Sequence, residues 1–114
     1  MTNLELIKYA KKLKIPHFRG VFMRDELVTM NPQRYESGII NLDSSRGSGT
    51  HWVAYSKKNK RVVYGDSFGL RPPPEVKKYF KGNQLLYSSD QIQEFDASNC
   101  GKLSLLFLIK ETGV

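Results

Sequence analysis

The N-terminal part of the chain places apolar and polar residues at the spacing of a helix. Thr2 and Glu5 have the S/T-x-x-E spacing of a capping box, which satisfies backbone N–H groups at a helix start. Together with the apolar positions that follow, this predicts an amphipathic helix over residues 2–13. A turn is expected at residues 18–20 and a short helix at residues 24–30. The apolar positions of the first helix are Leu6, Ile7, Ala10 and Leu13.

Beyond the first third of the chain the pattern changes to that of strands, with β-branched and aromatic residues in short runs. Strands are predicted at residues 38–43, 51–55 and 61–64. A polar tip at residues 57–60 joins the last two as an antiparallel hairpin, because it is short and rich in lysine and asparagine. A flexible Gly-Ser-Gly loop at residues 47–49 precedes the hairpin.

The C-terminal half of the sequence returns to helices. Pro74 suits the first position of a helix that contains residues 75–80, and a short strand is expected at residues 85–87. A polar loop follows over residues 88–99. The last helix, at about residues 101–112, is apolar along most of its length and is expected to be buried.

The order of these elements predicts an α+β fold, with a small mixed or antiparallel sheet flanked by helices. Residues 1–114 are expected to form one domain, since this length suits a single core. No apolar stretch approaches the roughly 20 residues of a membrane-spanning helix. Because the N-terminus lacks the long uncharged run of a signal peptide, we expect an intracellular protein with no membrane contact.

The chain is basic, with a formal net charge of +7 and a sequence pI of about 9.6. Lysines and arginines gather at residues 8–14, 57–61 and 77–81, so the surface is expected to attract polyanions such as nucleic acid. A single cysteine excludes an internal disulfide. With only His17 and His51 beside it, a structural zinc site is not expected either.

That cysteine, Cys100, stands at the start of the last predicted helix, where the helix dipole favours thiolate over thiol. A thiol nucleophile needs a base and a group that orients the base. His51 begins one strand of the hairpin and Asp66 follows the other, fifteen positions later, so both lie at one edge of the sheet. The backbone N–H of Cys100 and the side-chain amide of Gln93 could stabilise an oxyanion. This combination favours a cysteine hydrolase.

Each of these residues also has an ordinary structural interpretation. A lone cysteine is commonly a small core residue, a strand histidine a hydrogen-bonding group, an aspartate a turn former and a loop glutamine a solvated amide. The order and spacing of Cys100, His51, Asp66 and Gln93 favour the catalytic interpretation over four separate ones. His17, between Pro16 and Phe18, has no such partner and is expected to be structural or exposed.

The four residues and their surroundings resemble the adenain-like cysteine proteases, typified by the adenovirus protease and found in Maverick/Polinton elements. Their clan includes the SUMO-deconjugating proteases. The similarity covers most of residues 15–109 and is strongest in residues 49–55 and 64–69, and in Gln93 followed by Cys100-Gly101. The order His, Asp, Gln, Cys is also that of the clan.

The resemblance implies that Cys100 is the nucleophile at the N-terminus of a buried C-terminal helix. By the same resemblance, His51 is the general base and then the acid, Asp66 orients His51, and Gln93 donates to the oxyanion. It further implies that Trp52 forms a wall of the site. Gly47 and Gly49 are expected in the substrate groove.

The family's activity implies a monomeric, metal-independent endopeptidase that cleaves viral or transposon-encoded precursor proteins at small or glycine residues, in a host nucleus or a virion. Activation by DNA or by a viral peptide is implied by the resemblance alone. Ser104 stands where many members have a second cysteine, and Gly65 where they have a bulky aromatic residue. The sequence ends at Val114, earlier than the adenovirus protease, so a minimal or C-terminally shortened domain is expected.

Two alternatives share these features. A protease that removes ubiquitin-like modifiers would use the same four residues and differ in its recognition surface. A non-catalytic nucleic-acid-binding module would use the basic faces and retain the site as a relic.

Overall fold

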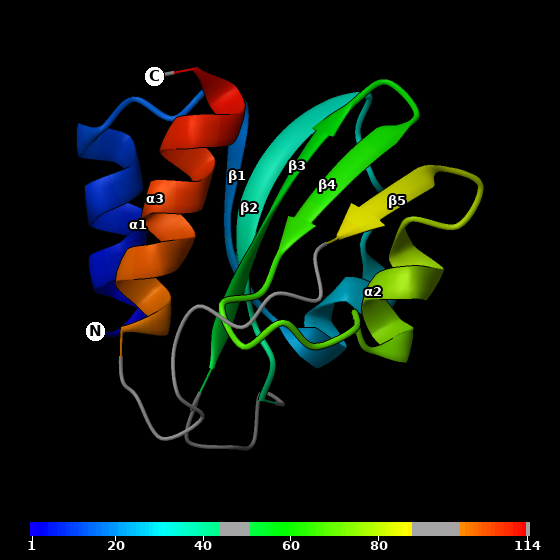
Figure 1. Ribbon diagram of the computed structural model, residues 1–114, viewed down its shortest axis with the longest axis horizontal. Coiled ribbons are helices and arrows are strands. Elements are labelled where there is room, and N and C mark those ends of the chain that lie inside the picture. The colour runs from blue at the N-terminus through cyan, green and yellow to red at the C-terminus, as the bar shows by residue number, and fades with distance from the viewer. Residues whose placement is uncertain (44–50, 88–98, 114) are drawn as a thin grey trace.

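The protein forms a five-stranded sheet with helices on both faces (Figure 1). The computed structural model describes residues 1–43, 51–87 and 99–113. This is the α+β architecture expected from the sequence. The elements in chain order are α1 (Asn3–Lys12), β1 (Phe18–Met23), the 3₁₀-helix η1 (Arg24–Thr29), β2 (Tyr35–Asn41), β3 (Trp52–Lys58), β4 (Arg61–Gly65), α2 (Pro74–Tyr79), β5 (Gln84–Tyr87) and α3 (Cys100–Thr112).

The sheet is mixed, with strand order β1-β2-β3-β4-β5. Strands β2, β3 and β4 pair antiparallel, while each outer strand pairs parallel with its neighbour. The predicted β3–β4 hairpin is confirmed, and its tip includes Asn59 in the left-handed region at φ 56°. Asparagine tolerates this conformation better than most residues.

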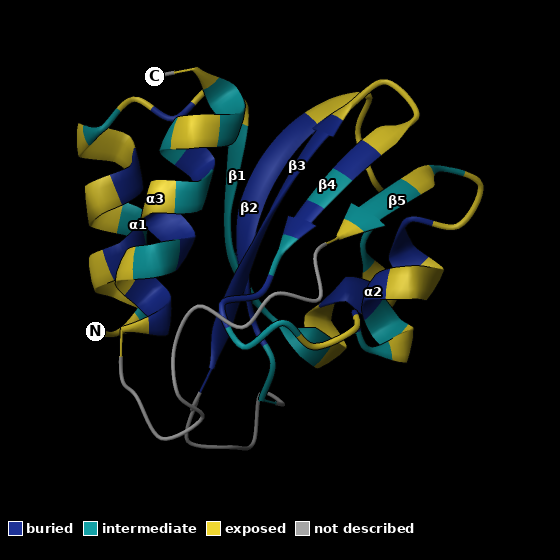
Figure 2. Ribbon diagram, in the orientation of Figure 1, coloured by how far each residue is buried: buried dark blue, intermediate teal, exposed yellow. Residues whose placement is uncertain are grey.

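Two hydrophobic cores lie on opposite faces of the sheet. Helices α1 and α3 cover one face, and α2 with η1 covers the other. Strands β2 and β3 are buried along most of their length, whereas α1 and α3 expose their outer sides (Figure 2). Residues of β3 alternate between the cores, so that Trp52 and Ala54 face α3 while Val53 and Tyr55 face α2.

The first helix matches its prediction closely. The side-chain oxygen of Thr2 accepts a hydrogen bond from the backbone N–H of Glu5 at 3.1 Å, and the Glu5 carboxylate accepts from the Thr2 N–H at 2.9 Å. This is the expected capping box. The last helix is also confirmed, and it begins at Cys100.

One local prediction was wrong. The expected turn at residues 18–20 belongs to strand β1, which pairs parallel with β2. The last helix buries one side, which includes Leu105 and Leu108, while Leu106 on its outer side is 52% exposed. The predicted loop over residues 88–99 lies almost wholly outside the described residues. No helix in the described ranges is both long and apolar enough to cross a membrane.

Glu36 of β2 is a buried carboxylate that ties several elements together. It accepts hydrogen bonds from the hydroxyls of Tyr55 at 2.6 Å and Tyr79 at 2.9 Å, and from the Gln33 backbone N–H. Arg19 of β1 forms an ion pair with it at 3.4 Å. Burial and the neighbouring Glu36 charge both raise the pKa of Tyr55, so this hydroxyl stays a donor. The carboxylate therefore links β1, β2, β3 and α2.

Replacing Glu36 with alanine should strongly destabilise the protein, because the buried hydroxyls of Tyr55 and Tyr79 would lose this acceptor and Arg19 would lose its ionic partner. The expected loss in the free energy of unfolding is about 3–5 kcal/mol, measured by urea titration. Glu36→Gln, which keeps an acceptor oxygen, should lose less. Glu111→Ala, at a partly exposed position of α3, is the control. A loss for Glu36→Ala no larger than the control's would contradict this role.

Candidate active site

Cys100 is the first residue of α3 and is 2% exposed. The N-cap residue, Asn99, makes no side-chain capping bond. Figure 1 shows that this end of α3 lies at the same end of the sheet as the start of β3 and the end of β4. The fold therefore brings the thiol to the edge where the sequence places a histidine and an aspartate.

His51 and Asp66 meet at this edge, as the hairpin predicts. His51 immediately precedes β3 and Asp66 immediately follows β4. Nε2 of His51 lies 2.7 Å from Oδ1 of Asp66. Both side chains are largely buried, with side-chain exposures of 9% and 1%. A carboxylate at this distance fixes the orientation of the imidazole and stabilises its protonated form.

Phe68 completes the support of this pair, and the sequence reasoning missed it. Its ring stacks on the His51 ring with centroids 4.0 Å apart and planes 6° apart. Its backbone N–H donates to Oδ1 of Asp66 at 2.8 Å, which closes an Asx turn. The Asp-Ser-Phe-Gly turn was visible in the sequence, but the stacking on His51 depends on the tertiary fold.

The second nitrogen of His51, Nδ1, is buried, and no described residue lies in ordinary hydrogen-bond geometry to it. Because Nε2 is occupied by Asp66, Nδ1 is the ring nitrogen left for Cys100. The two side chains interact closely enough for each to change the other's pKa. His51 therefore interacts with Asp66 on one side and with Cys100 on the other, which is the order that nucleophilic catalysis by a thiol requires.

The electrostatics of the site favour a charged pair. Burial lowers the pKa of His51, but the hydrogen bond to Asp66 and the interaction with Cys100 outweigh it and raise the pKa from 6.5 to about 9. Burial raises the pKa of the Cys100 thiol, but His51 and the backbone N–H groups of Trp52 and Gly101 bring it below its ordinary value of 9.0. Both shifts favour thiolate beside imidazolium over thiol beside neutral imidazole.

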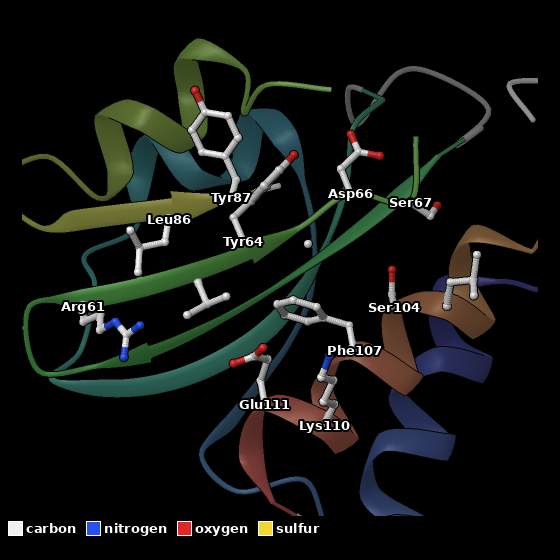
Figure 3. A pocket seen from close by; sticks show the side chains of 13 residues that line it. Arg61, Tyr64, Asp66, Ser67, Leu86, Tyr87, Ser104, Phe107, Lys110 and Glu111 are labelled. Atoms are coloured by element: carbon white, nitrogen blue, oxygen red, sulfur yellow. The ribbon is translucent and has the colours of Figure 1, made fainter. Parts of the chain in front are cut away.

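Gly65 allows α3 to approach the hairpin closely. A Cβ on Gly65 would lie 2.4 Å from the ring of Phe107, whereas one on Gly101 would lie 3.4 Å from the Trp52 ring, an ordinary contact. Phe107 points from α3 toward β4 (Figure 3). The ring of Phe107 therefore fills the space over Gly65, the position at which many members of the resembled family have an aromatic residue.

A pocket of about 540 Å³ lies between α3 and strands β4 and β5, and Figure 3 views it. Asp66, Ser67 and Ser104 line its end near the site, while Arg61 and Lys110 line it farther away. Neither Cys100 nor His51 lines it. It therefore borders the aspartate side of the site rather than the thiol.

The remaining predicted site residues have different outcomes. Gln93, Gly47 and Gly49 lie outside the described residues, so their roles stay predictions. Trp52 packs beside Gly101, and its ring N–H donates to Asn3 at 2.7 Å. Among the described side chains, no group of three histidine, cysteine or acidic residues is placed to hold a metal ion.

The fold is similar to two crystal structures of the ASFV pS273R protease. One matches with a TM-score of 0.69 and 17% sequence identity, over 99% of this chain and 58% of that chain. The selenomethionine form matches with a TM-score of 0.67 and 17% identity, over 100% and 59%. This chain thus spans less than two thirds of their length. Comparisons with protein-family models and with curated proteins gave no match. The similarity shows that this chain shares the protease fold.

The pKa shifts predict how the reactivity of Cys100 depends on pH. The thiolate should form below the ordinary thiol pKa of 9.0, and its imidazolium partner should persist up to about pH 9 because the His51 pKa is raised. Iodoacetamide labelling rates from pH 4 to 10 should therefore show a midpoint below pH 9. His51→Asn should move the midpoint upward, since burial then acts with less opposition. His17→Asn, at an exposed position, is the control, and equal midpoints in both variants would refute the pairing.

Gly65→Ala should destabilise the protein because its new methyl group overlaps the Phe107 ring. Overpacking of this kind costs about 1–3 kcal/mol in the free energy of unfolding. The cost should fall when Phe107 is replaced by leucine, and a double-mutant cycle in urea measures this coupling. Strictly additive costs would show that the ring does not limit residue 65.

Proposed function

We propose that this chain is a cysteine endopeptidase in which Cys100 attacks the peptide carbonyl. The observation that carries the proposal is the hydrogen bond between His51 and Asp66, which leaves Nδ1 of a buried imidazole for the Cys100 thiol. The similarity to the ASFV pS273R protease supports it, because that protein is a protease built on the same fold.

The reaction begins from the thiolate–imidazolium pair. The sulfur of Cys100 bonds to the carbonyl carbon, and the carbonyl electron pair moves to oxygen. The backbone N–H of Cys100 and the side-chain amide of Gln93 are the proposed donors to this oxyanion. Imidazolium at His51 gives its proton to the leaving amine as the C–N bond breaks. His51 then takes a proton from water, which attacks the thioester and releases the acid and Cys100.

Asp66 acts on this sequence through His51. Its Oδ1 lies 2.7 Å from Nε2 and leaves Nδ1 for the thiol. Because the carboxylate favours imidazolium, it also favours the thiolate that imidazolium accompanies. The ring of Phe68 restricts rotation of His51 out of this position.

The proposed substrates are viral or transposon-encoded precursor proteins, cut where small or glycine residues flank the scissile bond. The resemblance to adenain-like proteases supports this class. A contact with DNA is proposed from the net charge of +7, which favours polyanions. A modifier-removing protease would use the same four residues and is distinguished by its substrate.

Cys100→Ala should abolish hydrolysis of fluorogenic peptides with glycine near the scissile bond. His51→Asn and Asp66→Asn should lower kcat/KM by about 10³-fold or more, because the triad acts as a unit. His17→Asn is the matched control, since His17 is exposed and stacks on Tyr35 instead. If hydrolysis survives Cys100→Ala, another group cleaves the peptide. Salt-sensitive DNA binding with no hydrolysis by the parent protein would favour the non-catalytic module.

A further inference from the structure

A second pocket, of about 660 Å³, lies in the groove between α1 and α3. Asn99, the residue before Cys100, lines it, so the pocket reaches the end of α3 that carries the proposed nucleophile. Cys100, His51 and Asp66 are not among the described residues that line it. Its volume is in the range of sites that hold a ligand or several side chains. The lining residues are Met1, Tyr9, Lys12, Leu13, Asn99, Lys102 and Leu105.

The pocket combines apolar walls with positive charge. Tyr9 and Leu13 of the α1 segment face Leu105 of α3 across it, and Tyr9 is 41% exposed. Lys12 and Lys102 line the same groove, and none of the described residues that line it is acidic. Both lysines are exposed, and within the described residues neither forms a salt bridge. Such a surface is complementary to an apolar side chain beside a carboxylate.

The charge of the first turn of α3 points the same way. This turn holds no acidic residue, although acidic groups are favoured at a helix N-terminus, and Lys102 occupies it instead. A lysine here opposes the helix dipole. An incoming carboxylate would complement both the lysine and the dipole.

We propose that this pocket is a specificity subsite that binds a segment of the polypeptide substrate with an aliphatic or aromatic residue next to Asp or Glu. The inference rests on the proposed endopeptidase activity. A peptide whose carbonyl lies at Cys100 advances about 3.3 Å per residue when extended. Because Asn99, next to Cys100, lines the pocket, we expect the acidic and apolar residues within about four residues of the scissile bond.

The test uses fluorogenic peptides with a glycine-flanked cleavage site, in which Asp, Asn or Lys is scanned through four positions on each side. At one or two positions the wild type should prefer Asp over Asn by about tenfold in kcat/KM, from two lysines at roughly two- to fivefold each. Lys12→Glu with Lys102→Glu should remove this preference and favour Lys. Lys8→Glu with Lys11→Glu makes the same change in net charge outside the pocket and should keep it.

A binding measurement separates this inference from the proposed function. The Cys100→Ala protein should bind the fluorescein-labelled Asp peptide more tightly than its Asn form, and added salt should reduce the difference. If no peptide is cleaved but this preference persists and depends on Lys12 and Lys102, the endopeptidase proposal fails and the subsite stands. If peptides are cleaved with no Asp preference, or if both double variants lose it equally, the subsite is wrong. Absence of cleavage and of acid-dependent binding would overturn both.

Discussion

The close approach of helix α3 to the β3–β4 hairpin is the constraint on which the candidate site depends. His51 directly precedes β3 and Asp66 directly follows β4, while Cys100 begins α3. The separation of α3 from the hairpin therefore sets the position of the thiol relative to the imidazole. Gly65 allows this approach, because a Cβ there would lie 2.4 Å from the ring of Phe107 on α3. A larger residue at this position would push the helix, and the thiol with it, away from the imidazole.

The register of the hairpin sets the distance between His51 and Asp66. Ala54 pairs with Gly65 at the end of the ladder, three residues after His51 and one residue before Asp66, so both residues lie at one edge of the sheet. A shift of one residue would turn Asp66 to the other face of the sheet. The left-handed Asn59 at the tip and the alternation of Trp52 and Val53 between two cores both hold this register. The hairpin alone therefore brings the acid and base together, and α3 adds the thiol.

This division of the site between the hairpin and α3 explains which of its features the sequence could predict. The hairpin, its histidine and its aspartate are close in sequence, and local patterns such as the alternation of strands and the polar tip define them. Strand β1 was missed because it pairs parallel with a strand that follows a 3₁₀-helix, and all its residues are half-buried, so no alternation marks it. The ring of Phe68 on His51, the exposure of Leu106 and the fit of Phe107 over Gly65 depend on tertiary packing. Local spacing contains no information about them.

The buried charged side chains Glu36, Asp66 and Lys57 each have a partner inside the protein, and this determines where the remaining positive charge can act. Glu36 is neutralised by Arg19 and hydrogen-bonded by two tyrosines, and Asp66 holds His51. Lys57, only 7% exposed, donates to the backbone carbonyls of Gln33 and Asn59 at 2.7 and 2.6 Å. Most of the other described lysines and arginines are exposed, so the positive charge of these residues lies mainly at the surface. There it acts on the approach of anionic partners and not on the fold, so charge reversal at exposed lysines separates recognition from stability.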